Sequence, residues 1–230
     1  TDYPRTTPLG GTVSITGTPT YGQSLTADTS KVTDPDNTDD KGITDTDLKY
    51  QWYRAGAAIT GATNTDYIAA KADVGKALTV SVYTDDYSAV TSTSVTIGKA
   101  TPTLTVDRAS LALKTGATGT FTVTLGGVTG ESDTLTPSVV SKNNTVASVT
   151  GPASGNTYTV TAGSAEGNTE ITVSFGNSYY ETVTKTVGVN VTTRTVTTVV
   201  LKNAPRKQEY VYGETFDPTG LSVTVTYDDQ

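Results

Sequence analysis

Apolar residues alternate with Thr or Ser along most of the chain, with the two-residue period of a strand that buries one face. Thr suits the water-facing positions because its branched Cβ retains strand propensity. No helical stripe of apolar residues accompanies this pattern. We therefore predict an all-β protein whose core positions include Val13, Ile15, Leu78, Val80, Val82, Val95, Ile97, Leu104, Val106, Phe121, Val123, Leu125, Ile171, Val173, Phe175, Leu221, Val223 and Val225.

Turn-forming dipeptides separate these strands at the spacing of a β-sandwich. They are Gly126-Gly127, Asn143-Asn144, Gly151-Pro152, Gly176-Asn177 and Asp228-Asp229.

Short polar bridges after closing strands predict the domain organisation. Residues 1–98 and 99–192 each have the length of an immunoglobulin-like sandwich. Residues 193–230 are too few to bury a sandwich core alone. We expect this third unit to be the truncated start of a further domain, and the alternative is that it docks as extra strands.

Composition removes several classes of function. The 230 residues include 51 Thr but no Cys, His or Met. Without Cys or His there is no Ser-His-Asp or Cys-His catalysis, no Cys/His zinc site and no disulfide. A translated chain starts with Met, so a chain that begins with Thr1 and contains no Met predicts a processed or excised segment.

The net charge also argues against two kinds of binding partner. A net charge of −7 repels nucleic acid and anionic lipid headgroups, so we expect neither as a partner. No run approaches the roughly 18 apolar residues of a membrane span, so we expect no direct membrane insertion by this segment.

The first unit contains Tyr50-Gln51-Trp52-Tyr53, Asp73-Val74-Gly75 and several shorter motifs in a fixed order, and this set resembles a bacterial Ig-like repeat of large surface proteins. Tyr50-Gln51-Trp52-Tyr53 stands where such a sandwich has its core tryptophan, and Asp73-Val74-Gly75 where a turn feeds the next strand. The unit departs from antibody domains in lacking both cysteines, so packing around Trp52 must hold its two sheets together. The remaining motifs are residues 11–17, 21–25, 59–63 and Tyr67.

The second unit looks like a group 2 bacterial Ig-like domain, a type found in bacterial adhesins. Its motifs are residues 110–116, 144–149, 158–163 and 169–173. Residues 207–223 are similar to the opening of a group 3 or group 4 bacterial Ig-like domain. Together these resemblances imply an extracellular location at the bacterial cell surface or cell wall, and they supply no ligand.

Two groups of side chains are candidate binding sites. Spaced carboxylates in a loop suit Ca²⁺, although this run lacks the ordered acids of an EF-hand and a solvated acidic loop is the alternative. Paired tyrosines could stack on sugar rings, the alternative being that one tyrosine of each pair packs inward. The candidates are Asp34, Asp36, Asp39 and Asp40 for Ca²⁺, and Tyr179, Tyr180, Tyr83 and Tyr87 for a glycan ligand.

We expect no enzyme activity, because neither resemblance carries the pair of carboxylates that a glycosidase needs. The leading hypothesis is a segment of a large bacterial surface protein that acts in adhesion or as a stalk. Its partner would be a protein or glycan of a host or neighbouring cell. The alternative is an accessory spacer or glycan-binding region of a secreted polysaccharide-degrading enzyme.

Overall fold

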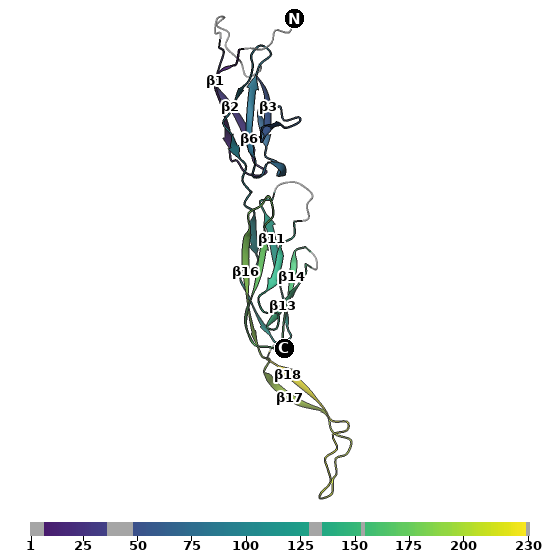
Figure 1. The fold of residues 1–230 in the computed structure, drawn as a ribbon. Helices are drawn as coiled ribbons and strands as arrows, with labels where there is room; N and C mark the ends of the chain where they lie inside the picture. Colours follow the sequence, from purple (N-terminus) through teal and green to yellow (C-terminus); the bar gives the residue numbers. More distant parts are fainter. Residues whose placement is uncertain (1–6, 36–47, 129–134, 153–154, 229–230) are drawn as a thin grey trace. The chain divides into compact units, whose positions relative to one another are not determined.

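The computed structural model describes residues 7–35, 48–128, 135–152 and 155–228, and strands dominate these ranges (Figure 1). The one helical element within them is a single 3₁₀ turn, η1 (Lys71–Asp73). The chain forms two compact units. The first comprises Thr1–Leu104, Leu125–Pro137 and Ser174–Val183, and the second Thr105–Thr124, Ser138–Val173 and Thr184–Gln230.

The N-terminal part of the first unit is a sandwich of two antiparallel sheets. One sheet has the order β1-β2-β5 and the other the order β4-β3-β6-β7, with β8 also pairing with β6. The strands are β1 (Gly10–Gly17), β2 (Ser24–Thr33), β3 (Lys49–Arg54), β4 (Ala57–Ala58), β5 (Asp66–Ile68), β6 (Ala77–Tyr83), β7 (Val90–Thr91) and β8 (Val95–Thr96).

Trp52 lies at the centre of this sandwich, as the sequence predicts. Its side chain is fully buried, and its ring stacks on Tyr67 with 5.4 Å between centroids. The indole Nε1 donates to the carbonyl of Asn64 at 2.9 Å, so the one polar atom of the side chain is satisfied. Alternate residues of the paired strand β6 pack around it, and Leu78, Val80 and Val82 are also fully buried.

The second sandwich also pairs two sheets. One has the order β10-β16-β15-β12, with β10 parallel to β16, and the other the order β13-β14-β11-β9. The strands are β9 (Thr103–Val106), β10 (Ser110–Lys114), β11 (Thr118–Gly126), β12 (Ser138–Ser141), β13 (Ala147–Thr150), β14 (Thr157–Ala162), β15 (Gly167–Phe175) and β16 (Val183–Thr192).

The core of the second sandwich is aliphatic around one aromatic pair. Phe121 and Tyr158 stack with 5.7 Å between ring centroids. The period-two positions of β15 and β16 point inward, and Ile171, Val173 and Val187 are fully buried. The tandem β-sandwich fold predicted from the alternation is therefore confirmed, whereas the boundaries at residues 98 and 192 stay predictions.

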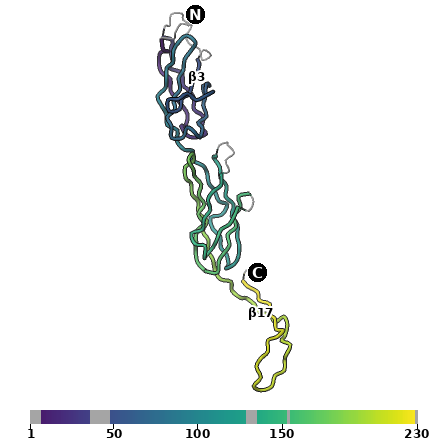
Figure 2. The backbone as a smooth tube through the Cα atoms, turned by 45° about the vertical axis from the view of Figure 1, so that its right-hand side comes forward, coloured from purple at the N-terminus to yellow at the C-terminus, as the bar shows by residue number. Residues whose placement is uncertain are grey.

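The last part of the second unit is a two-stranded hairpin of β17 (Val196–Asn203) and β18 (Ser222–Tyr227), joined by a long loop (Figure 2). Its register pairs Val199 with Val225 and Leu201 with Val223, so one face is aliphatic. That face is open, since Val199 is 60% exposed and Leu201 58%. The hairpin thus has the alternating aliphatic residues of a sheet that buries one face. Among the described residues, however, no second layer covers that face.

We predict that Thr169→Val stabilises the second sandwich by about 1 kcal/mol, because it removes a hydroxyl that is buried without a partner. Thr169 lies on the inward face of β15, and its Oγ1 has no hydrogen-bond partner among the described residues. Chemical denaturation followed by circular dichroism measures the change. Thr186→Val on the exposed side of β16 is the control, and an equal gain there would contradict this explanation.

Candidate functional site

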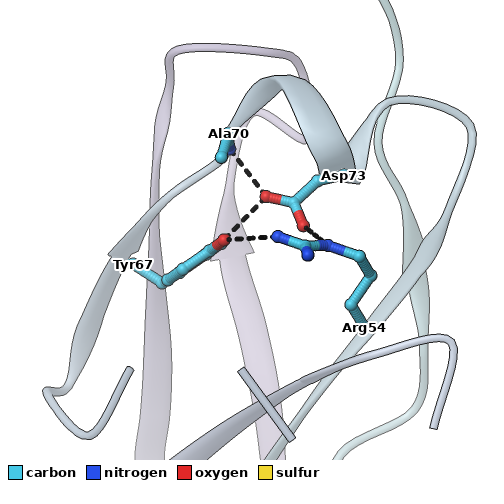
Figure 3. Close-up of polar contacts among 4 residues, drawn as sticks. All are labelled: Arg54, Tyr67, Ala70 and Asp73. Atoms are coloured by element: carbon cyan, nitrogen blue, oxygen red, sulfur yellow. Dashed lines mark hydrogen bonds and ion pairs between the residues drawn. The ribbon is translucent and has the colours of Figure 1, made fainter. Parts of the chain in front are cut away.

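The most deeply buried charged group among the described residues is the carboxylate of Asp73, whose side chain is completely inaccessible. Figure 3 shows its contacts with Arg54, Tyr67 and Ala70. Its Oδ1 accepts from Arg54 Nε at 2.5 Å. Its Oδ2 accepts from the Tyr67 hydroxyl at 2.7 Å and from the backbone N–H of Ala70 at 2.6 Å. Arg54 Nη2 also donates to the Tyr67 hydroxyl at 3.5 Å, so the group forms a closed ring of hydrogen bonds.

Three elements position these side chains. Arg54 is the last residue of β3, in one sheet of the first sandwich, and Tyr67 is the middle residue of β5, in the other. Asp73 ends η1, where its carboxylate caps the backbone of the turn at Ala70. A carboxylate is the side chain that can satisfy all three donors at once, since it offers about four acceptor sites. The Asp73 cluster therefore joins both sheets and the turn that leads into β6.

The electrostatics of the cluster keep Arg54 protonated and Tyr67 neutral at ordinary pH. The hydrogen bond to Asp73 raises the pKa of Arg54, with the negative charge of Asp73 adding to the effect. Burial raises the pKa of Tyr67 to about 12, and its hydrogen bond to the Asp73 carboxylate adds to this, because a phenolate there would face a second anion. Neither shift brings a group toward the neutral pH at which a general acid or base works best.

The arrangement holds two sheets together and leaves no group free for catalysis. Both carboxylate oxygens are occupied by donors from within the sandwich, and the carboxylate is closed to solvent. A chain without cysteine cannot join its sheets by a disulfide, and this hydrogen-bonded ion pair makes a connection between them instead. The sequence pattern places Arg54, Tyr67 and Asp73 in their strands and turn, but it does not predict their contact, because they lie on three different elements.

The candidate glycan-binding tyrosines lie in partly or wholly covered positions. Tyr180 is 2% exposed and packs in the first unit with Tyr21 and Phe175, with ring centroids 5.4 and 5.7 Å away. Tyr179 is half-buried, and Lys71 Nζ lies 5.1 Å from its ring centroid. In this structure the ring of Tyr180 is covered by its neighbours, so a sugar ring could not stack on it without a rearrangement. Glycan binding by Tyr179 stays a prediction.

The other tyrosine pair lies at the end of β6 and in the turn that follows it. Tyr83 and Tyr87 are both half-buried, and Tyr87 packs against the core of the first sandwich. The prediction that these rings bind a glycan is untested.

The candidate calcium ligands fall mostly outside the described residues. Asp34 is half-buried just after β2, whereas Asp36, Asp39 and Asp40 lie outside the described ranges. Across the parts of the chain that the structure describes, no three acidic side chains are grouped as a metal site would require. Calcium binding by this loop stays a prediction.

Four surface hollows on the described residues each contain a single carboxylate, that of Asp28, Asp66 or Glu170. A glycosidase needs two carboxylates on either side of the bond that it cleaves. None of these four hollows offers such a pair.

No helix within the described ranges has the length and apolar character needed to cross a bilayer.

The two sandwiches define a tandem β-sandwich protein, and in the first sandwich the buried carboxylate of Asp73 bonds side chains from both sheets. No protein-family model matches the chain, and no curated protein matches it.

Several solved structures are similar to this chain. The S-layer protein rSbsC(31-844) matches at 19% identity over 96% of this chain and 37% of its own, with a TM-score of 0.37. The Escherichia coli adhesin FdeC matches at 19% identity over 80% of this chain and 65% of its own, with a TM-score of 0.32. The fibronectin(III)-like modules of Clostridium thermocellum CbhA match at 17% identity over 79% of this chain and 94% of their own, with a TM-score of 0.26.

We predict that Asp73→Ala destabilises the first sandwich by about 3 to 5 kcal/mol, because it leaves a guanidinium, a phenol and a backbone N–H without their shared acceptor. Trp52 is the only tryptophan and lies in this sandwich, so its fluorescence during urea unfolding measures the loss. Asp85→Ala breaks the exposed ion pair with Lys49 and should cost no more than about 1 kcal/mol. Equal effects of the two variants would show that the Asp73 cluster does not hold the sheets.

We also predict that the first sandwich loses stability between pH about 10 and about 12, and that Tyr67→Phe reduces this loss. The pKa of Tyr67 is raised to about 12 in the folded chain. Over that window the unfolded chain releases the phenol proton while the folded chain retains it, so the stabilising contribution is complete below pH about 10 and disappears as the pH rises.

The measurement is the free energy of unfolding from Trp52 fluorescence across this pH range. Tyr53→Phe, on strand β3 of the other sheet, is the control and should keep the wild-type slope. A Tyr67→Phe profile as steep as that of the wild type would show that Tyr67 does not cause the alkaline loss.

Proposed function

We propose that this chain is a non-catalytic segment of a large bacterial cell-surface protein, acting in cell adhesion or as a stalk that presents other domains. The observation that supports this most directly is the Asp73 cluster. Both oxygens of its buried carboxylate accept hydrogen bonds from groups that belong to the two sheets and to η1. A carboxylate bonded in this way holds the two sheets in a fixed arrangement, which is what a stalk or spacer needs. The resemblance of the sequence to bacterial Ig-like repeats supports the same role.

A location outside the cell is part of this proposal. Outward positions carry Thr where many proteins carry charge, and charged residues make up only 17% of the chain. Hydroxyls do not titrate, so such a surface keeps its character when the external pH changes. The partner would then be a protein or glycan of a host or neighbouring cell.

An exchange experiment separates adhesion from spacing. The parent protein is displayed on its cell with residues 7–228 intact, or with this segment replaced by an unrelated pair of β-sandwiches of equal length. A stalk would tolerate the replacement and keep its surface attachment, whereas an adhesive segment would lose it. Attachment unaffected by outright deletion of the segment would contradict both roles.

The alternative proposal is an accessory region of a secreted polysaccharide-degrading enzyme, with Tyr179 as the half-buried ring that could contact sugar. Retention of the protein on insoluble polysaccharides tests it. Tyr179→Ala should reduce retention and Tyr179→Phe should preserve it, because stacking needs the ring and not the hydroxyl. Unchanged retention of Tyr179→Ala would rule against this residue. Tyr180→Ala is a poorer probe, since that ring is buried and its loss would disturb packing.

A further inference from the structure

The junction between β16 and β17 is a short segment where the chain leaves the second sandwich for the hairpin. Lys114, the last residue of β10, pairs in parallel register with Thr192, the last residue of β16. The backbone N–H of Thr115 donates to the carbonyl of Thr192 at 2.9 Å. The side chain of Lys114 therefore stands beside the point where the chain exits the sheet.

Three charged side chains contact the exit segment from three different elements. Lys114 Nζ donates to the carbonyl of Thr193 at 3.1 Å and lies 2.8 Å from Asp228 Oδ2. Asp228, just after β18, accepts the backbone N–H of Thr195 at 3.1 Å. Glu166, in the turn before β15, accepts the backbone N–H of Thr193 at 3.0 Å. Each charged group thus bonds backbone at the exit, and Lys114 also connects β10 directly to the base of the hairpin.

Beyond these contacts, no layer among the described residues packs on the hairpin and stabilises it. Two-stranded hairpins are marginally stable in water unless they pack against another layer. The aliphatic face of β17 and β18 is open, with Val199, Leu201 and Val223 about half exposed or more. Its loop is held by local polar contacts, in which the hydroxyl of Tyr210 bonds both N–H and carbonyl of Asp217.

We propose that Lys114, Glu166 and Asp228 form a clasp that docks the β17–β18 hairpin onto the second sandwich, so that the order of the hairpin depends on these charges. The clasp stabilises the hairpin by fixing both of its ends: the start of β17 through Thr193 and Thr195, and the end of β18 through Asp228. It would couple the second sandwich mechanically to the chain that follows it. The inference does not rest on the proposed surface role.

The side chains of the clasp interact more strongly when charged. The hydrogen bond from Lys114 lowers the pKa of Asp228, and the backbone of Thr195 lowers it further. Hydrogen bonds from Thr193 lower the pKa of Glu166. Another charged group on the exit segment is Arg194, whose guanidinium lies 5.7 Å from the ring centroid of Tyr227. The stabilisation by both carboxylates is therefore present at neutral pH and lost as the pH falls through their folded-state values.

Amide hydrogen exchange measured by NMR on the 230-residue chain tests the clasp. Lys114→Met keeps an apolar stem but removes the charge, and we expect exchange of the Thr195 amide and of the paired β17 and β18 amides to become about five- to tenfold faster. The amide of Val189 in the core of the sandwich should keep its protection. Lys142→Met is the matched control, because it breaks the exposed pair with Glu170 in the same sandwich and should leave the hairpin unchanged.

Asp228→Asn provides a second variant that leaves β10 intact, should Lys114→Met loosen the sandwich itself. It should accelerate hairpin exchange without affecting Val189. Wild-type protection of the hairpin in Asp228→Asn would overturn the proposal, as would equal acceleration by Lys142→Met. A second readout is the carboxyl titration of Asp228, which should move up toward its ordinary range in Lys114→Met and stay in place in Lys142→Met.

Discussion

The first sandwich depends on the charge of Asp73 being fully compensated inside the fold. A buried carboxylate without partners would cost several kcal/mol, so the folded state is favoured only when Arg54, Tyr67 and the Ala70 N–H all reach it. Those donors come from both sheets and from the turn between β5 and β6. The requirement to satisfy one anion therefore fixes the end of β3, the short strand β5 and the path into β6 at the same time. Antibody domains place a disulfide between their sheets, whereas this chain uses a non-covalent ring of hydrogen bonds next to its buried tryptophan.

The second sandwich reaches the same architecture by a different balance of forces. Its described core contains apolar side chains and a few hydroxyls but no charged group. Ser141 links the ends of β12 and β13, and hence the two sheets, through a bond of 2.6 Å to the carbonyl of Ala147. Thr169 buries a hydroxyl in the same core that has no hydrogen-bond partner among the residues described. In this sandwich the burial of apolar side chains is the main source of stability, and the buried hydroxyls make a smaller contribution.

The two-residue period predicts most of this fold because each sandwich strand buries one face and exposes the other. Strands β1, β6, β11 and β15 all contain alternating positions identified from the sequence. The same alternation in β18 does not lead to burial, because Val223 is 49% exposed on a hairpin face that no described layer covers. The burial of Trp52 follows instead from the resemblance of Tyr50-Gln51-Trp52-Tyr53 to the core strand of a bacterial Ig-like repeat. Contacts between elements could not be predicted, because periodicity says which face a residue occupies and not which residue of another strand it meets. The ion pair of Arg54 with Asp73, which lies 19 residues further along the chain, is one such contact between elements. The packing that buries Tyr180 is another.

The charges of this chain matter most where chain segments are joined. Thr provides much of the outer surface, and it can do so because a hydroxyl is satisfied by water at any ordinary pH. Three of the ion pairs within the described residues then act locally: Arg54 with Asp73 between β3 and η1, Lys114 with Asp228 at the hairpin base, and Lys207 with Glu214 inside the loop. Each of these pairs connects residues that are not neighbours in a regular strand ladder. In a chain without cysteine, charge pairing makes connections of the kind that disulfides make in antibody domains, and it leaves those connections responsive to pH where they are exposed.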